Sequence, residues 1–162
     1  MSYSLQQHLQ YNVWANGKLA EFIAKTDGKL FDTEVKSSFP SLRKTVFHIW
    51  DAEFIWLRRL QGESLSDWPS KNFGGTREDA LKGWVDGSKS FHAFISDKEE
   101  AYYQSVCAYK NTRGEEYKTT VEGIVMHVVN HGTFHRGQLV TMLRELDYTE
   151  LSSTDLITFL RL

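Results

Sequence analysis

Apolar residues recur at steps of three and four in four separate segments of the chain, which predicts four amphipathic helices. The first segment runs from Tyr3 to Thr26 and stops before Gly28, because glycine tolerates the left-handed backbone that closes many helices. The second begins near Pro40, since proline suits a first helical turn, and ends at Gly62. The apolar positions are Leu5, Leu9, Val13, Leu19, Phe22 and Ile23 in the first segment, and Leu42, Val46, Ile49, Trp50, Trp56, Leu57 and Leu60 in the second.

Two further helices are predicted in the second half of the chain, each opened by a capping box. Thr76 with Asp79 forms one box and opens a helix that extends to Ile95. Thr119 with Glu122 forms the other and opens a long helix. The apolar positions are Leu81, Trp84, Val85, Phe91 and Ile95 in the former, and Val121, Ile124, Val125, Val128, Leu139, Met142, Leu143 and Leu146 in the latter.

The segments between the helices complete the predicted fold. Residues 62–76 are rich in glycine and polar side chains, which indicates a long surface connection between helices that lie parallel or far apart. The tyrosine-rich segment 101–118 favours a short β-hairpin. A short last helix, capped by Ser153 or Thr154, follows. We therefore expect an all-α four-helix bundle with a long crossover connection, a β-hairpin insert before the last long helix, and a short C-terminal helix.

The composition fits one globular domain over residues 1–162. Of the 162 residues, 41% are apolar and 25% are charged. At this length folding buries roughly 70% of the surface of the unfolded chain, so no disulfide or structural metal is needed to hold the domain together. Any metal bound by this protein is therefore expected to serve its function and not the stability of its fold.

Charge and hydropathy exclude several classes of partner. The net charge is −2, with 19 basic and 21 acidic residues, which shows no nucleic-acid footprint. No apolar stretch approaches twenty residues and no leader segment is visible, so no membrane partner is expected. Cys107 is the single cysteine and is predicted to be structural rather than reactive. We expect a soluble cytoplasmic protein.

Three of the six histidines, His127, His131 and His135, are spaced four residues apart on the predicted long helix. Residues four apart lie one turn above one another, so each neighbouring pair can point into one pocket. Imidazole nitrogen is a good ligand for zinc and similar ions. The apolar stripe of the helix passes through His131 and His135, and buried imidazoles must form hydrogen bonds, bind a metal or line a wet cavity.

His48 on the predicted second helix is a candidate third ligand, at the edge of an apolar face. The spacing leaves open whether the pair that would join it is 127/131 or 131/135. A histidine on an apolar face is more often a satisfied core residue than a ligand, so spacing alone does not establish a metal site. His8 and His92 have no comparable partners and are predicted not to be ligands.

Four motifs in order along nearly the whole chain resemble the DinB family, also described as DinB/YfiT-like metalloenzymes. Residues 11–19, YNVWANGKL, are similar to the family's opening Y-N-x-W-A-N-x-x-L, and residues 48–57, HIWDAEFIWL, to its H-x-x-x-A-E-x-x-W-L. Residues 127–138, HVVNHGTFHRGQ, are similar to H-x-x-N-H-x-x-x-H-R-G-Q. Residues 153–160, STDLITFL, resemble the family's T-D-h-h-x-[FY] tail, where h is apolar.

The resemblance implies a four-helix bundle in which His48, His131 and His135 hold a divalent metal, with His127 as a neighbour of the site. The ligand set suits zinc, while nickel, iron or manganese could also occupy it. The family shares its label with a DNA polymerase, but the resemblance implies no contact with DNA. Relatives often form dimers, so a homodimer is an open expectation.

Three functions follow from such a site. A bound metal can lower the pKa of water or deprotonate a thiol. Because relatives include transferases that use low-molecular-weight thiols, the leading hypothesis is a thiol-dependent S-transferase-like enzyme acting on a small-molecule substrate. The alternatives are a metal-dependent hydrolase that uses metal-bound water, and a non-catalytic stress-response protein that binds a metal or small ligand. We expect the 62–76 connection and the hairpin to border the mouth of the cavity.

Several polar residues near the ligands have weaker assignments. Asp51 and Glu53 are the candidate carboxylates for proton transfer in hydrolysis. For Asp51 we favour an ordinary solvent-exposed charge on the helix surface. For Glu53 a supporting or structural role beside the site is the alternative to such a charge. Asn130 and Gln138 could form hydrogen bonds there, and Arg136 could bind an anionic cosubstrate or neutralise the surface. The polar and aromatic residues of the first motif, Tyr11, Asn12, Trp14 and Asn16, are predicted to pack and to complete internal hydrogen bonds.

Overall fold

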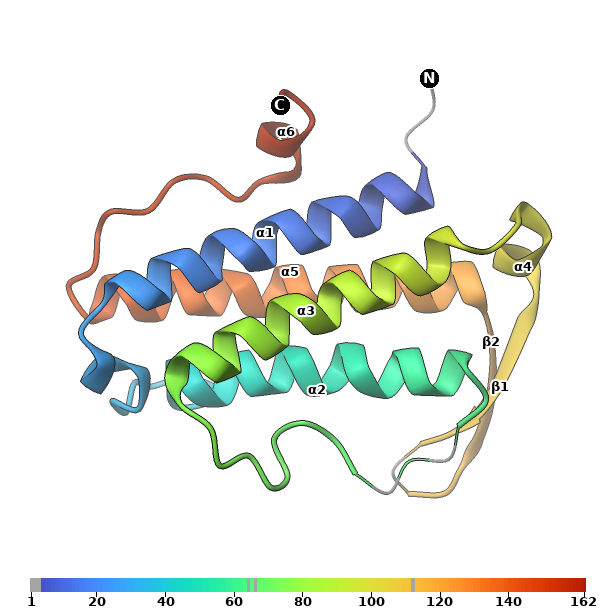
Figure 1. Ribbon diagram of the computed structural model, residues 1–162, viewed down its shortest axis with the longest axis horizontal. Helices are drawn as coiled ribbons and strands as arrows, with labels where there is room; N and C mark the ends of the chain where they lie inside the picture. Colours follow the sequence, from blue (N-terminus) through green and yellow to red (C-terminus); the bar gives the residue numbers. More distant parts are fainter. Residues whose placement is uncertain (1–3, 64, 66, 112) are drawn as a thin grey trace.

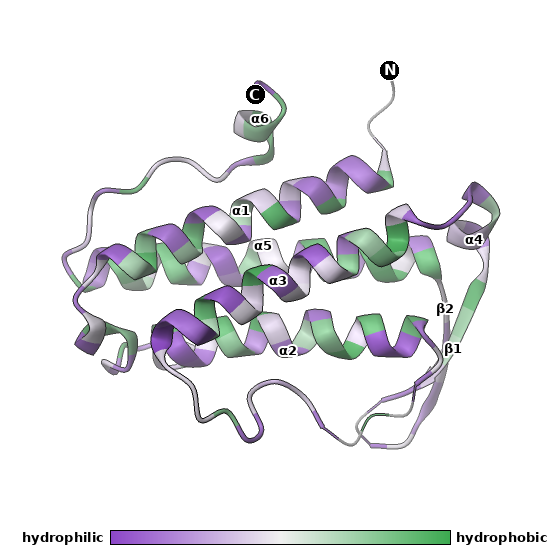
Figure 2. Ribbon diagram, viewed as in Figure 1, coloured by the Kyte–Doolittle hydropathy of each residue, from purple (hydrophilic) through white to green (hydrophobic). Residues whose placement is uncertain are grey.

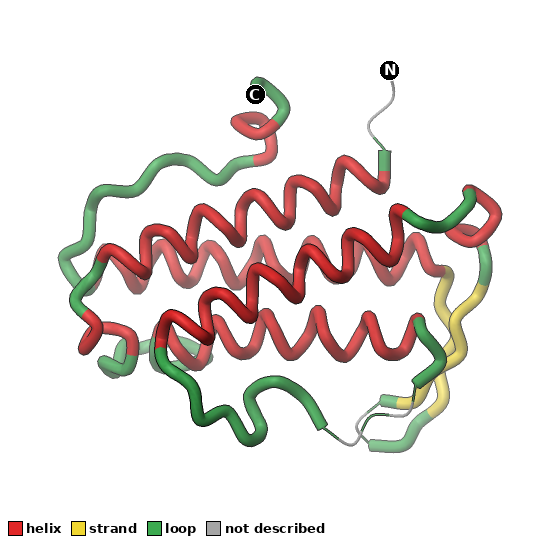
Figure 3. The backbone as a smooth tube through the Cα atoms, in the orientation of Figure 1, coloured by secondary structure: helices red, strands yellow, loops and turns green. Residues whose placement is uncertain are grey.

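The structure is a computed structural model that describes residues 4–63, 65, 67–111 and 113–162. Helices account for most of the described chain, and the predicted four-helix bundle is confirmed (Figure 3). The long helices are α1 (Leu5–Lys25), α2 (Leu42–Leu60), α3 (Arg77–Ser96) and α5 (Val121–Glu145). The short elements are the 3₁₀ turn η1 (Gly28–Phe31), helices α4 (Glu100–Gln104) and α6 (Leu156–Phe159), and strands β1 (Val106–Lys110) and β2 (Glu116–Thr120).

The helix directions explain the long connection. In Figure 1, α1 and α5 run one way along the bundle, whereas α2 and α3 run the other way. Both α1 and α2 pack against α3 and α5, so α1 and α2 lie on a diagonal. Because the consecutive helices α2 and α3 are parallel, the chain has to return along the length of the bundle over residues 61–76. This is the crossover that the composition of the segment predicts.

Helix starts depend on side-chain caps, and two predicted starts are wrong by one or two residues. Helix α2 is capped by Ser41, which accepts a hydrogen bond from Lys44 N, so the helix begins after the position predicted from Pro40. Helix α5 is capped by Thr120, whose Oγ1 accepts from Gly123 N, rather than by Thr119, whose Oγ1 lies 3.3 Å from the Tyr109 hydroxyl oxygen within the hairpin. A proline cannot supply the capping oxygen, and the Thr119 hydroxyl is engaged across the two strands.

Other boundaries follow local signals. The box formed by Thr76 and Asp79 opens α3 as predicted. Helix α1 is capped by Ser4, and the predicted start at Tyr3 lies outside the described residues. The last helix is capped by Asp155 without a side-chain hydrogen bond, so the predicted cap at Ser153 or Thr154 is wrong.

The insert between α3 and α5 is only partly a hairpin. Strands β1 and β2 pair antiparallel, with Val106 opposite Thr120 and Lys110 opposite Glu116. The first residues of the predicted hairpin segment form α4 instead, which packs against α5. Gly114 in the turn has φ +83°, a left-handed conformation that glycine adopts without strain.

The core consists of two apolar clusters with a polar layer between them. One cluster occupies the end of the bundle that holds the start of α2, and the other lies toward the hairpin. Green and purple segments alternate along each helix in Figure 2, as expected of amphipathic helices. The layer consists of buried polar side chains from all four long helices: Asn12, Asn16, Glu53, Ser88 and Arg136. Within the described residues, no helix has the length and apolar character needed to cross a membrane.

Candidate metal centre

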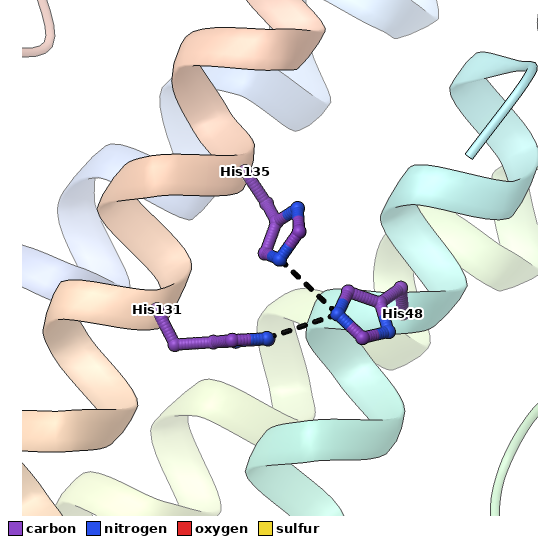
Figure 4. A group of neighbouring side chains, drawn as sticks. All are labelled: His48, His131 and His135. Atoms are coloured by element: carbon purple, nitrogen blue, oxygen red, sulfur yellow. Dashed lines mark hydrogen bonds between the residues drawn. The ribbon is translucent and has the colours of Figure 1, made fainter. Parts of the chain in front are cut away.

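Three imidazoles converge between α2 and α5. His48 projects from α2, and His131 and His135 project from successive turns of α5 toward it (Figure 4). His48 Nε2 lies 2.9 Å from His131 Nε2 and 3.1 Å from His135 Nε2. The geometry therefore places 131/135, and not 127/131, opposite His48, which is the pair that the family resemblance implies.

The donor atoms fit a single cation better than they fit one another. A neutral imidazole nitrogen carries either one proton or one lone pair, so His48 Nε2 cannot complete good hydrogen bonds to both partners at once. A cation accepts all three lone pairs. In a tetrahedral zinc site with Zn–N bonds of about 2.0–2.1 Å, ligand nitrogens lie roughly 3.3 Å apart, close to the two distances from His48 Nε2, and all three ligand atoms lie within 4.8 Å of one another. The three histidines could hold a divalent metal ion.

Gln138 orients one of the three rings. Its Oε1 accepts a hydrogen bond from His135 Nδ1 at 2.7 Å. Because Nδ1 then carries the proton, the lone pair of His135 is on Nε2, the atom that faces the other two rings. Gln138 lies one turn after His135 on α5, so the same helix supplies the ring and the group that fixes its tautomer.

Phe39 covers another part of the site. Its ring stacks on His48, with centroids 3.9 Å apart and an interplanar angle of 21°, and meets His135 edge-on at 5.6 Å. This contact could not be predicted from the sequence, because Phe39 precedes α2 in an irregular segment without hydrophobic periodicity. The aromatic ring limits the freedom of the His48 imidazole and shields one of its faces from water.

His48 and His131 are held in their neutral form. Burial, aided by the proximity of His135, lowers the pKa of His48 to about 4. Burial and the neighbouring imidazoles lower the pKa of His131 to about 4 as well. Metal ligation requires neutral imidazole, so both side chains are in the binding-competent state at neutral pH.

Among the described residues, these three histidines form the one group of three or more histidine, cysteine or acidic side chains whose ligand atoms could share an ion. Asp51 does not join them. Its carboxylate accepts hydrogen bonds from Ser70 N at 2.9 Å and Ser70 Oγ at 2.5 Å, which anchors the 61–76 connection to α2. The prediction of a solvated charge is therefore wrong for Asp51, and burial raises its pKa.

Glu53 belongs to the polar layer of the core. Asn12 Nδ2 and Asn16 Nδ2 donate to its Oε1 at 2.7 and 2.9 Å, and Ser88 Oγ donates to its Oε2 at 2.5 Å. Burial raises the pKa of the Glu53 carboxyl, and these three donors oppose that effect by favouring the anion. All its partners are core side chains, so Glu53 is engaged in structure rather than available as a base.

Arg136 lies in the same layer and is only 2% exposed. Its Nη1 donates to Asn12 Oδ1 at 2.6 Å and Asn16 Oδ1 at 2.7 Å, and its Nη2 donates to Thr133 Oγ1 at 2.7 Å. The guanidinium also lies over the Tyr11 ring, 5.3 Å from the centroid. Arg136 therefore neither binds a cosubstrate nor neutralises the surface. Asn12 and Asn16 form internal hydrogen bonds, as the sequence predicts.

The remaining candidates lie at the edge of the site or away from it. His127 is exposed and meets Trp56 edge-on, 5.5 Å between centroids, with the His131 ring 5.9 Å away. Asn130 is exposed on α5. Cys107 is half-buried in the hairpin, where burial raises the pKa of its thiol. Neither His8 nor His92 is part of the cluster.

The fold is a four-helix bundle in which three converging histidines could hold a metal ion, and comparison with known proteins gives the family. The DinB family pattern matches residues 1–160, so the chain belongs to the DinB family. Protein DinB from Bacillus subtilis (strain 168) is 28% identical over 146 residues, which cover 86% of this chain and 84% of the relative.

Solved structures show the same fold. A DinB-like protein from Bacillus cereus has a TM-score of 0.71 at 15% identity, covering 94% of this chain and 99% of its own. YfiT from Bacillus subtilis, described as a probable metal-dependent hydrolase with an unusual four-helix bundle topology, has a TM-score of 0.67 at 15% identity, covering 91% and 92% of the two chains. At these identities the likeness is one of fold.

Proposed function

We propose that this protein is a divalent-metal-dependent enzyme that transfers the sulfur of a low-molecular-weight thiol to an electrophilic carbon of a small molecule. The observation that carries the proposal is the set of three convergent imidazoles without a carboxylate among them in the described residues. When bound there, a divalent metal would supply Lewis acidity that lowers the pKa of a thiol or a water molecule.

The chain's own residues would prepare this chemistry. Gln138 keeps the proton of His135 on Nδ1, so that Nε2 is free to bind the cation. Phe39 stacks on His48 and excludes water from one face of the ligand. Neutral ligands add no negative charge, so the full charge of a cation would be available to favour an anionic sulfur.

The engaged state of the nearby carboxylates favours thiol over water as the nucleophile. Hydrolysis needs a base to move a proton from water, and both sequence candidates are occupied: Asp51 by Ser70, and Glu53 by the core asparagines and Ser88. A thiol has a pKa of about 8.5 against about 16 for water, so it requires far less assistance. Its proton would pass to solvent as the sulfur–carbon bond forms and the leaving group departs.

Hydrolysis is the second candidate, because YfiT, which shares this fold, is described as a probable metal-dependent hydrolase. Here His127 is the side chain placed to move a proton, since its ring lies 5.9 Å from that of His131 and is exposed. A reducing cytoplasm would suit the thiol reaction, since it keeps a thiol cosubstrate reduced.

A thermal-shift experiment tests the proposal. Protein loaded in turn with zinc, nickel, iron(II) and manganese would be mixed with cysteine, glutathione and other small thiols. A thiol at a hundred times its dissociation constant adds about 2.7 kcal/mol to the free energy of unfolding. We expect at least one thiol to raise the melting temperature of the metal-loaded protein, and this effect to be lost in His131→Ala. Mass spectrometry should then detect the product in which that thiol has replaced the halide of an aryl halide.

Absence of any thiol effect would contradict the proposal. Metal-dependent cleavage of ester or amide substrates without thiol would then support the hydrolase. Metal binding without turnover of either kind would support a binding protein.

A further inference from the structure

A cavity of about 1010 Å³ is lined by the C-terminal half of α2, the β1–β2 hairpin and the 61–76 connection. These segments meet at the lower right in Figure 1. Its walls include Ile55 and Arg59 of α2, Tyr109 and Lys118 of the hairpin, and Trp68 of the connection. Ile55 lies seven residues after His48, or about two turns and roughly 10 Å along α2, on nearly the same face. The cavity therefore follows the helix face that carries the candidate metal centre.

Arg59 is held rigidly at this cavity. Its guanidinium carbon lies 4.6 Å from the centroid of the Trp56 ring and 5.0 Å from that of Tyr109. One of its nitrogens, Nη2, donates to the carbonyl oxygen of Lys110 at 3.0 Å. Cation–π contacts and a backbone hydrogen bond fix the side chain before any ligand arrives, which reduces the entropy lost on binding.

The charges lining the cavity do not cancel. Glu63 is paired with Arg58 at 2.9 Å, and Glu116 is paired with Lys110 at 3.4 Å. Arg59 also lines the cavity and has no ion pair within the described part of the chain. The two acidic residues are thus neutralised by partners, while the Arg59 guanidinium is left without a counter-ion at the cavity.

We propose that this cavity binds an organic anion, with its carboxylate or phosphoryl group on Arg59 and its apolar part against Ile55 and Trp68. A guanidinium presents N–H donors in a fork that matches both kinds of anionic group. That this anion is the substrate or cosubstrate of the metal-dependent reaction rests on the proposed function. The binding step itself does not need the metal.

Calorimetric titration with three probes tests the proposal: phenylphosphonate, benzoate and the neutral benzyl alcohol. The full-length protein would be titrated in its metal-loaded form and as the His131→Ala variant. We expect at least one anionic probe to bind both proteins, with quenching of tryptophan fluorescence, while benzyl alcohol binds at least about tenfold more weakly. The preference between phenylphosphonate and benzoate identifies the anionic group.

Variants of Arg59 locate the site. Arg59→Gln should raise the dissociation constant about tenfold or more, which corresponds to the loss of a charged hydrogen bond. Arg113→Gln is the matched control, because Arg113 is exposed at the hairpin and is paired with Glu115. Arg59→Lys keeps the charge and guards against a loss of fold, which circular dichroism would show.

The outcomes separate this proposal from that of the metal reaction. Binding that survives His131→Ala but is weakened by Arg59→Gln supports it, even if no thiol transfer is ever found. Equal binding to wild type and a folded Arg59→Gln variant overturns it, and so does anion binding that is lost in His131→Ala, since the anion would then occupy the metal. Failure of all anionic probes to bind also overturns it.

Discussion

Glu53 and Arg136 are joined through two shared asparagines at the centre of the bundle. Asn12 and Asn16 each donate a hydrogen bond to Glu53 Oε1 and accept one from Arg136 Nη1. Two opposite charges from α2 and α5 are thereby fixed relative to α1. Since α2 carries His48 and α5 carries the other two histidines, this network sets the register of the helices that present the candidate ligands.

Removal of Glu53 should strongly destabilise the protein. Glu53→Ala leaves the Arg136 charge buried without its opposite charge and removes the carboxylate that accepts from Asn12, Asn16 and Ser88, which costs about 3–5 kcal/mol. Urea denaturation followed by circular dichroism measures the free energy of unfolding.

Glu21→Ala is the control for this measurement. Glu21 is exposed and forms an ion pair with Lys18 on the surface of α1, so its loss should cost no more than about 1 kcal/mol. Equal effects of the two substitutions would show that the Glu53 network does not stabilise the fold.

Gly132 should be intolerant of a methyl group. A Cβ at this position would lie 2.9 Å from Arg136 Nη1 and 3.0 Å from Asn12 Oδ1, both fixed in the buried network. Gly132→Ala is therefore expected to destabilise by about 1–3 kcal/mol, although alanine is the better helix former. On the same helix, a Cβ at Gly137 meets nothing within 4 Å, so Gly137→Ala should stabilise by a few tenths to about 1 kcal/mol. The same sign for both variants in urea denaturation would refute the steric argument.

Local signals account for the parts of the fold that could be predicted. Helix periods, the capping box at Thr76 and Asp79, and the turn-rich hairpin are all encoded within a few neighbouring residues. Where two neighbouring residues could each begin a helix, as at Pro40 and Ser41, the sequence does not decide. The structure shows that the residue with a capping oxygen prevails.

The candidate site was only partly predictable for a related reason. Spacing on one helix identifies ligand pairs, but the choice between 127/131 and 131/135 depends on how α5 is set against α2, which the family resemblance supplied. Contacts between distant segments leave no local pattern. The partners of Glu53 lie 41, 37 and 35 residues away in the sequence, so its place in the core could not be derived from α2 alone.

Metal content should depend on the clustered histidines. His131→Ala and His135→Ala are expected to abolish binding, since two remaining imidazoles make a weak site. His8→Ala and His92→Ala should keep the stoichiometry of the wild type. Elemental analysis of purified proteins gives the answer, with metal added after purification to avoid ions carried from an affinity column. Full metal content in His131→Ala would remove the basis of the proposed site.

Gln138 should tune the affinity without being a ligand. Gln138→Leu removes the acceptor of the His135 Nδ1 proton and should weaken metal binding about 10–100-fold, with the stoichiometry unchanged at saturation. A competition titration with a chromophoric chelator measures this affinity. Thr141→Val, on the exposed side of the same helix, is the control and should leave the affinity unaltered. Unchanged affinity in Gln138→Leu would show that the hydrogen bond does not prepare the ligand.

Acidification should destabilise the metal-free protein between about pH 6.5 and pH 4. In the unfolded chain the imidazoles take up protons near pH 6.5, whereas in the folded protein the pKa of His48 and of His131 is about 4. Over this range the unfolded state binds more protons, so the free energy of unfolding falls as the pH falls. Above this range both states carry neutral imidazoles and the contribution is constant. Melting temperatures in the presence of a chelator would follow the effect.

The double variant His48→Gln with His131→Gln isolates the contribution of these two imidazoles to the pH dependence of the melting temperature. Burial also lowers the pKa of His8 and of His92, and both are kept in the variant, so its melting temperature should still fall with acid but less steeply than that of the wild type. The same slope in both proteins would mean that the two imidazoles take up protons in the folded state as readily as in the unfolded chain. Their neutrality at the candidate metal centre would then come from the bulk pH alone and not from burial between α2 and α5.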